Sequence, residues 1–178
     1  MLILIIINYL QTMFPIKDDN PTETRPYITC ILISINILVY FYQLGLAETD
    51  NYALIIKYGF KPNHLFALEF TTNYTVSPFL TVFTSMFLHG GFFHIIGNML
   101  FLWIYGNNIE DSMGHIKFLI FYLTCGFAAA LLQASLSSTS STPMIGASGA
   151  VSGVMSAYFL LFPKARVLTL IILLFFIT

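Results

Sequence analysis

The stretch from Phe118 to Pro163 has the sequence FLIFYLTCGFAAALLQASLSSTSSTPMIGASGAVSGVMSAYFLLFP and contains no aspartate, glutamate, lysine or arginine. A helix needs about 20 predominantly apolar residues to cross the ~30 Å hydrocarbon core of a bilayer, so this stretch is long enough for two crossings. Residues 135–143 divide it, because they are rich in serine and threonine and end in a helix-breaking proline. We therefore predict membrane spans at about 118–134 and 148–162.

The composition is that of a membrane protein rather than a soluble domain. Hydrophobic residues make up 57% of the 178 residues and charged residues 8%, against roughly 25% charged in an ordinary soluble domain. The mean hydropathy is +0.82, and the length fits one domain. The net charge of −1 comes without a basic patch, which argues against a nucleic-acid partner. Cys30 and Cys125 lack the spacing of a metal site.

Three further apolar segments extend the pattern. Residues 26–47 are uncharged and predict the first span, and residues 84–105 predict the second. The adjacent acidic pair Glu110 and Asp111 is interpreted as the solvated end of that second span. Residues 167–178 are apolar again and predict a fifth helix that is incomplete. The predicted fold is therefore an all-α, polytopic membrane helix bundle that lies in a lipid bilayer.

The basic residues predict the orientation of this bundle. If the five segments alternate in direction, the basic residues divide into a larger and a smaller group: Lys17, Arg25, Lys117, Lys164 and Arg166 on one side, and Lys57 and Lys61 on the other. The larger group favours a cytoplasmic N-terminus. The Ser/Thr-rich loop then lies on the outer side, together with the entry to the second span.

Three polar residues in this apolar chain require an explanation, because polar groups inside a membrane are expensive and usually functional. Ser148 lies between Gly146 and Gly149 at the start of the fourth span, which is too short to cross the bilayer and so begins below its surface. His94 and Asn98 have the i, i+4 spacing of one helix face. The predicted orientation places all three in the outer half of the bundle, a combination that indicates hydrolysis within the bilayer.

Four patches of the sequence, in this order and spacing, resemble those of the rhomboid intramembrane serine proteases: FPIKDDNP at 14–21, FTSMFLHGGFFHIIGNM at 83–99, GASGAVSG at 146–153 and FPKARV at 162–167. The resemblance covers the chain from about Met13 onward. It implies a cytoplasmic N-terminal segment at 13–25 and a rhomboid membrane domain at 26–178. Residues 1–12 are interpreted as an apolar N-terminal extension, either from an upstream start or as a short interfacial segment.

The resemblance also implies roles for single residues. Ser148 would be the nucleophile, while His94 and Asn98 would stabilise the oxyanion, for which an imidazole and an amide are suitable donors. Gly149 and Gly153 form a Gly-x-x-x-Gly pair that permits close helix packing, with Gly146 preceding them, and in rhomboids the partner is the last core helix. His89 is interpreted as a structural residue that bonds loop backbone. No cofactor or metal is implied, since the chemistry needs only water.

The general-base histidine of the family lies on a sixth span, and this chain ends inside the fifth. The four histidines present are His64, His89, His94 and His115, and none has the position of that base. We therefore expect a C-terminally truncated rhomboid, with about five of six core spans present, that is inactive by itself. In the complete protein the substrates would be transmembrane segments of other proteins, and the location a bacterial cell membrane.

Two other function classes stay open at this point. The first is a catalytically inactive rhomboid-like protein that binds membrane clients without cutting them. The second, which we rank low, is a metal-dependent membrane hydrolase or transporter that uses His89, His94 and His115, although no His-Glu-x-x-His motif is present. A soluble α/β-hydrolase is excluded, because Ala150 replaces the last glycine of Gly-x-Ser-x-Gly and no strand precedes it.

Overall fold

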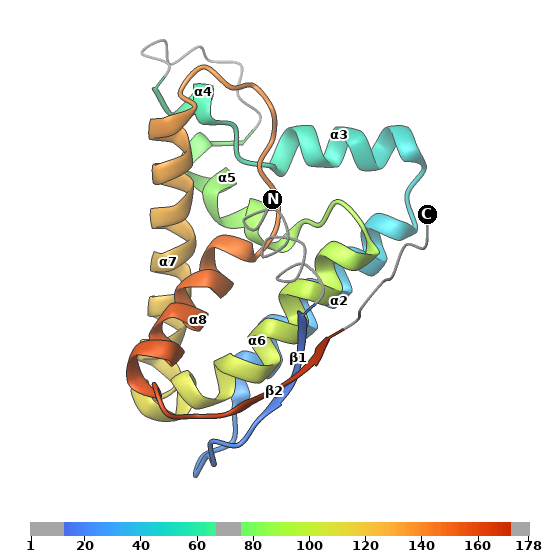
Figure 1. The fold of residues 1–178 in the computed structure, drawn as a ribbon. Coiled ribbons are helices and arrows are strands. Elements are labelled where there is room, and N and C mark those ends of the chain that lie inside the picture. The colour runs from blue at the N-terminus through green and yellow to red at the C-terminus, as the bar shows by residue number, and fades with distance from the viewer. Residues whose placement is uncertain (1–12, 67–75, 172–178) are drawn as a thin grey trace, which may run out of the picture.

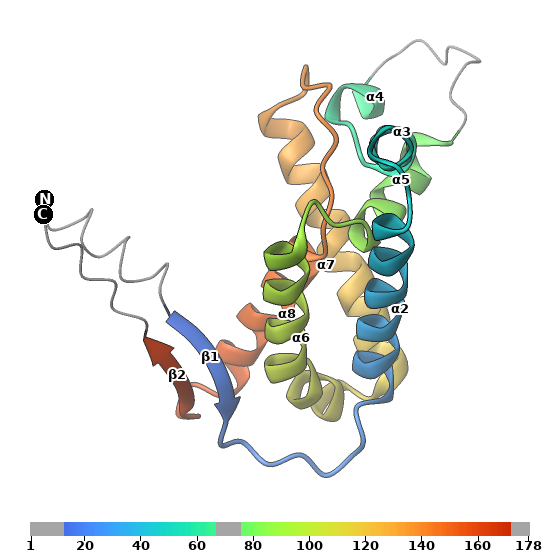
Figure 2. The same ribbon diagram turned by 90° about the vertical axis from the view of Figure 1, so that its right-hand side faces the viewer.

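The structure is a computed structural model that describes residues 13–66 and 76–171, and within them it is predominantly helical (Figures 1 and 2). The elements, in chain order, are β1 (Met13–Asp18), α2 (Tyr27–Leu44), α3 (Glu48–Tyr58), α4 (Pro62–Phe66), α5 (Pro78–Thr84), the 3-10 helix η1 (Ser85–Phe87), α6 (Phe92–Met113), α7 (His115–Leu136), α8 (Ser148–Leu161) and β2 (Val167–Ile171). The predicted extension at 1–12 lies outside the described residues. The architecture is a bundle of helices, the longest of which are apolar, as predicted for a membrane helix bundle.

The long helices lie where the sequence predicts spans. By length and composition α2 and α7 can each cross a membrane, and α5–η1 together with α6 forms a third candidate that is bent by 87°. The bend falls at Gly90 and Gly91, which are poor helix formers. The helix α6 therefore begins at Phe92 and ends at Met113, whereas the sequence predicted a span over about 84–105. The helix α8 has 14 residues, about 21 Å at 1.5 Å per residue, and is too short to cross the bilayer.

The prediction of a fifth helix is wrong for residues 167–171. Val167–Ile171 forms strand β2, which pairs antiparallel with β1 so that Met13 lies opposite Ile171. Valine, threonine and isoleucine favour strands, and the N-terminal strand supplies the edge with which they pair. The two strands lie on the outside of the bundle beside α6 (Figure 2). Residues 172–178, the remainder of the predicted helix, lie outside the described residues.

The Gly-x-x-x-Gly pair packs against α7. A Cβ added at Gly149 would lie 2.6 Å from the Cβ of Ala129, and one added at Gly153 would lie 2.6 Å from the Cβ of Cys125. Real side chains do not approach so closely, so both positions require glycine for the contact between α7 and α8. The resemblance implied that the last core helix packs on this stripe, and within the described residues the third span, α7, also lies against it.

Glu110 is not solvated, contrary to the prediction. Its side chain is fully buried and accepts hydrogen bonds from the backbone N–H groups of Ile28 and Thr29, each at 2.8 Å, and from the Thr29 hydroxyl at 2.8 Å. His115 Nδ1 lies 2.6 Å from Glu110 Oε1, the oxygen that also accepts from Ile28. Glu110 therefore caps the first turn of α2, where backbone N–H groups have no intrahelical acceptor. The neighbouring Asp111 remains partly exposed.

The N-terminal segment is bound to the end of the bundle that carries Glu110. Asp18 Oδ2 accepts hydrogen bonds from Asn108 Nδ2 at 2.7 Å and from the Tyr158 hydroxyl at 2.8 Å. Asp19 Oδ1 accepts one from the backbone N–H of Arg166 at 2.7 Å. The patches at 14–21 and 162–167 thus meet at the end of α8 that is farthest from Ser148 (Figure 1).

The opposite end of the bundle brings two long loops together. Phe60 and Met144 form an isolated β-bridge, and the backbone N–H of Asn63 donates to the carbonyl of Ser140 at 3.1 Å. The loop that contains α3 and α4 and the Ser/Thr-rich loop therefore lie on one side, as the alternation of spans requires.

Candidate active site

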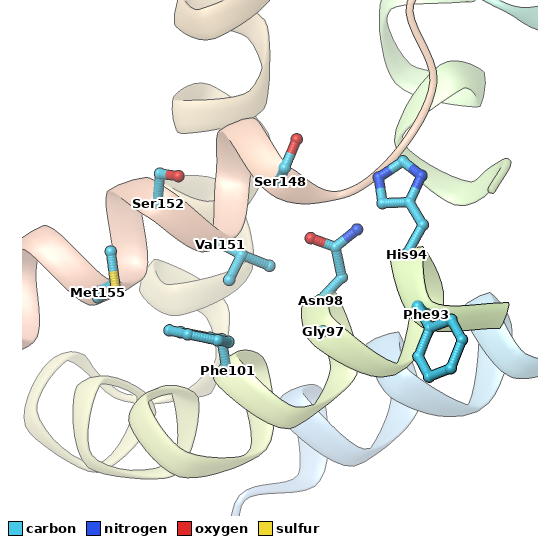
Figure 3. Close-up of a pocket in the computed structure, with 9 residues that line it drawn as sticks. All are labelled: Phe93, His94, Gly97, Asn98, Phe101, Ser148, Val151, Ser152 and Met155. Atoms are coloured by element: carbon cyan, nitrogen blue, oxygen red, sulfur yellow. The ribbon is translucent and has the colours of Figure 1, made fainter. Parts of the chain in front are cut away.

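A surface pocket of about 330 Å³ lies between α6 and α8 (Figure 3). The helix α6 contributes Phe93, His94, Gly97, Asn98 and Phe101, and α8 contributes Ser148, Val151, Ser152 and Met155. Ser148, His94 and Asn98, which the sequence singles out, are all among these residues. Their shared pocket agrees with the prediction that all three lie in the same half of the bundle.

Ser148 is the first residue of α8 and is exposed at the pocket. The first backbone N–H groups of a helix have no intrahelical acceptor and form a natural anion site when they point at a ligand. The Ser148 hydroxyl forms no hydrogen bond with any part of the chain that the structure describes. It is therefore accessible, and a base that would remove its proton is not in contact with it.

His94 and Asn98 project from successive turns of α6 toward the start of α8 (Figure 3). The loop before α8 approaches the His94 ring so closely that a Cβ at Gly146 would lie 2.5 Å from Nε2. Gly146 also has φ +112°, a conformation that residues with a Cβ rarely adopt. Both observations require glycine at this position, and the sequence prediction that Gly146 belongs to the packing around the site is consistent with them.

The side chain of Asn98 forms a hydrogen bond with the ring of His89. The Asn98 side chain is 7% exposed and its Nδ2 lies 3.1 Å from Nε2 of His89, which is 1% exposed. The sequence interpretation gave His89 a loop-backbone partner, and in the structure its ring bonds Asn98 as well as interacting with the backbone carbonyl of Phe87. The backbone of His89 is itself bonded by Gln43, a residue of α2 that sequence reasoning missed. The available signal was an uncompensated amide in the first apolar span.

The histidines do not converge on a metal ion. His115 lies with Glu110 at the C-terminal end of α6, while His89 and His94 lie near its N-terminal end. Over residues 13–66 and 76–171, no group of three or more histidine, cysteine, aspartate or glutamate side chains could hold a metal. This geometry gives no support to the low-ranked metal-dependent alternative.

Comparison with known proteins agrees with the fold. The family model for the Rhomboid domain matches residues 77–178. Rhomboid protease GluP of Bacillus subtilis (strain 168) is 29% identical over 155 residues, covering 84% of this chain and 28% of that protein. Rhomboid protease AarA of Providencia stuartii is 32% identical over 145 residues, covering 73% of this chain and 49% of that protein.

A plant relative shows a shorter match. RHOMBOID-like protein 6, mitochondrial, of Arabidopsis thaliana is 38% identical over 74 residues, covering 42% of this chain and 24% of that protein. The chain thus spans less than a third of GluP and about half of AarA. Because the family model covers more than half of the sequence, the chain belongs to the rhomboid family.

Proposed function

We propose that the chain is the membrane domain of a serine endopeptidase that cleaves transmembrane segments of other proteins within the bilayer. Ser148 is the nucleophile, and His94 and Asn98 bind the oxyanion. The observation that carries this proposal is that these three residues line the same pocket, in a chain whose relatives include proteins named as rhomboid proteases.

The chemistry requires a base as well as these groups. A serine hydroxyl is a weak nucleophile until a neighbouring base takes its proton. His89 is bonded to Asn98 and His115 to Glu110, while His94 is assigned to the oxyanion. We propose that the base is a histidine on a further span of the natural protein, as the family resemblance implies.

The substrate must lose helical structure locally before it is cut. Within a helix the backbone carbonyls are engaged in i to i−4 hydrogen bonds, so an intact transmembrane helix hides the atom that Ser148 would attack. The pocket between α6 and α8 offers polar groups from Ser148 and Asn98 to an unwound segment. This class of substrate follows from the membrane location of the site.

A catalytically inactive rhomboid-like protein that binds membrane clients is the second candidate. The observation that favours it is the Ser148 hydroxyl, which has no hydrogen-bond partner and no base beside it among the residues described. In that case a transmembrane client would bind to the complete protein and be recovered uncut. Mass spectrometry of the client after incubation distinguishes the two functions.

Loss of either oxyanion donor tests the proposed protease. In the full protein we expect His94→Ala and Asn98→Ala each to lower kcat for a model transmembrane substrate about 100- to 1000-fold, the usual effect of removing one such donor. Gln133→Ala is the matched control, because this exposed amide on α7 bonds only Ser137. Cleavage at wild-type rates by the His94 or Asn98 variants would remove these residues from the mechanism.

We further propose that the N-terminus is cytoplasmic and that the protein resides in a bacterial cell membrane. The basic residues near β1 and β2 support this orientation, and the two protease relatives described above are bacterial. In a background with Cys30→Ala and Cys125→Ala, cysteines replacing Ser138 and Lys57 should react with an impermeant thiol reagent from outside. Cysteines replacing Lys117 and Lys164 should react only after the cell is opened. Labelling of the Ser138 and Lys117 positions from one side would contradict the orientation.

A further inference from the structure

The loop between η1 and α6 contacts both proposed oxyanion donors. Its residues Leu88–Gly91 include His89, which bonds Asn98 through its ring, and Gly90, whose backbone N–H points at Nδ1 of His94 at 3.5 Å. Two successive glycines end the loop, and glycine is the most conformationally free residue. A contact with another part of the protein must therefore fix this loop if His94 and Asn98 are to keep their positions.

Gln43 provides that restraint. Its side chain is 3% exposed at the C-terminal end of α2. Oε1 accepts a hydrogen bond from the His89 backbone N–H at 3.0 Å, and Nε2 donates to the His89 carbonyl at 3.1 Å. Nε2 also donates to Oδ1 of Asn51 on α3 at 3.1 Å. One carboxamide thus satisfies both backbone groups of His89, as a neighbouring strand would.

The bond between His89 and Asn98 determines where the imidazole carries its proton. An amide nitrogen can only donate, so the 3.1 Å contact from Asn98 Nδ2 requires Nε2 of His89 to be the acceptor. The neutral ring must then be protonated at Nδ1. The Phe87 carbonyl interacts with this ring, although Nδ1 has no partner in strict hydrogen-bond geometry among the described residues. The second N–H of Asn98 remains available at the pocket that this residue lines.

The bond from Gly90 has the corresponding effect on His94. A backbone N–H that points at Nδ1 requires that nitrogen to accept, which leaves the proton of a neutral ring on Nε2. Nε2 is also the atom that Gly146 approaches at the entrance to α8. The loop thus favours a donor at Nε2 of His94 and a free N–H on Asn98, the two groups that an oxyanion needs.

We propose that Gln43 is a positioning residue: it fixes the loop at His89 and thereby sets the hydrogen-bond polarity of both His94 and Asn98. The inference deepens the proposed function and rests on it for its catalytic meaning. Because the side chain acts through backbone groups of His89, it does not touch the substrate. Glutamine suits this position because it carries a donor and an acceptor on one rigid plane. Among the residues that the structure describes, these bonds alone compensate its burial in an apolar span.

The test is a ¹⁵N nuclear magnetic resonance measurement of the histidine rings in the full protein in lipid nanodiscs. The chemical shifts separate protonated from unprotonated ring nitrogens, so they give the tautomer directly. We expect His89 protonated at Nδ1 and His94 at Nε2. In Gln43→Met, which keeps the length of the side chain and removes its hydrogen bonds, both rings should become mixtures of tautomers. The kcat for a transmembrane substrate should fall about 100-fold with KM unchanged, as for a misplacement of about 1 Å.

Asn36→Leu is the matched control. Asn36 is another fully buried amide of α2, and its Nδ2 bonds the Leu32 carbonyl of its own helix. Its loss removes a buried amide from the same span, yet it should leave both tautomers as in the wild type. Equal mixing in the two variants would mean general loosening of the bundle and would overturn the proposal.

Two further results would also overturn it. The first is unchanged ring tautomers in Gln43→Met, which would make Gln43 a packing residue. The second is a wild-type His89 ring protonated at Nε2, and this measurement stands even if Gln43→Met does not fold. Failure of the proposed function is distinguishable from both, because it would appear as uncut substrate with the tautomers as expected.

Discussion

Replacing Ser148 with alanine in the full protein is expected to abolish cleavage of a transmembrane substrate, with a fall in kcat of about a millionfold, the scale observed when a nucleophilic serine is removed. The substitution removes only the hydroxyl oxygen. Because Ser148 is exposed at the pocket and its hydroxyl bonds no described group, the fold should be unaffected. Cleavage is measured with a fluorescent substrate in nanodiscs, and the fold by circular dichroism and thermal unfolding.

Ser156→Ala is the matched control for this variant. Ser156 lies two turns further along the same helix, is exposed, and bonds the Ser152 carbonyl without lining the pocket. The loss of a hydroxyl from α8 should therefore leave kcat within a few-fold of the wild type. If Ser148→Ala cleaved the substrate at the wild-type rate, another group would be the nucleophile, and the proposed protease mechanism would be withdrawn.

The sequence predicts those features that depend on local composition and spacing. The spans at α2 and α7 follow from uncharged apolar stretches, and α8 begins at Ser148 as predicted, because proline and glycine in the preceding loop stop helix formation. The pocket shared by His94, Asn98 and Ser148 follows from motif spacing together with the alternation of spans. Each of these inferences needs only neighbouring residues or the direction of a helix.

The features that were missed depend on partners far apart in the chain. Gln43 bonds a residue 46 positions away, and Glu110 bonds residues 81 and 82 positions away. Periodicity and propensity carry no information on such pairs. Strand β2 was predicted as helix for the same reason, since Val167–Ile171 becomes a strand only through pairing with β1. An apolar run alone does not distinguish a helix from a strand.

These hydrogen bonds between residues far apart in the sequence have a common structural role. Two polar side chains, Gln43 of α2 and Glu110 of α6, bond backbone groups in a loop or at a helix end, where no regular hydrogen bond is available. Gln43 does so at the loop before α6, and Glu110 does so at the first turn of α2. In lipid an unsatisfied backbone group costs several kcal/mol, so buried amides and carboxylates are retained where the backbone is irregular. The stability of the bundle therefore depends on a few polar residues as well as on apolar packing.

Glu110→Ala is expected to destabilise the protein more than any other single substitution at the Glu110 end of the bundle. It leaves the backbone N–H groups of Ile28 and Thr29 without their acceptor, at ~1–3 kcal/mol for each unsatisfied donor, so we expect a total loss of about 3 kcal/mol. His115 also loses its partner. The free energy of unfolding is measured by denaturant titration in mixed micelles.

Asp111→Ala provides the comparison for Glu110→Ala. Asp111 accepts bonds from the backbone N–H groups of Glu23 at 3.1 Å and Thr24 at 2.8 Å, so it also binds two backbone donors, here in the loop before α2. These bonds are exposed, water can replace them, and the expected loss is below about 1 kcal/mol. The loss for Glu110→Gln should lie between those for Glu110→Ala and Asp111→Ala. The amide keeps one acceptor oxygen, but its NH₂ group faces N–H donors where the carboxylate had a second acceptor. A Glu110→Ala loss no larger than that of Asp111→Ala would mean that water or a backbone shift satisfies the start of α2, and that the buried carboxylate is not its cap.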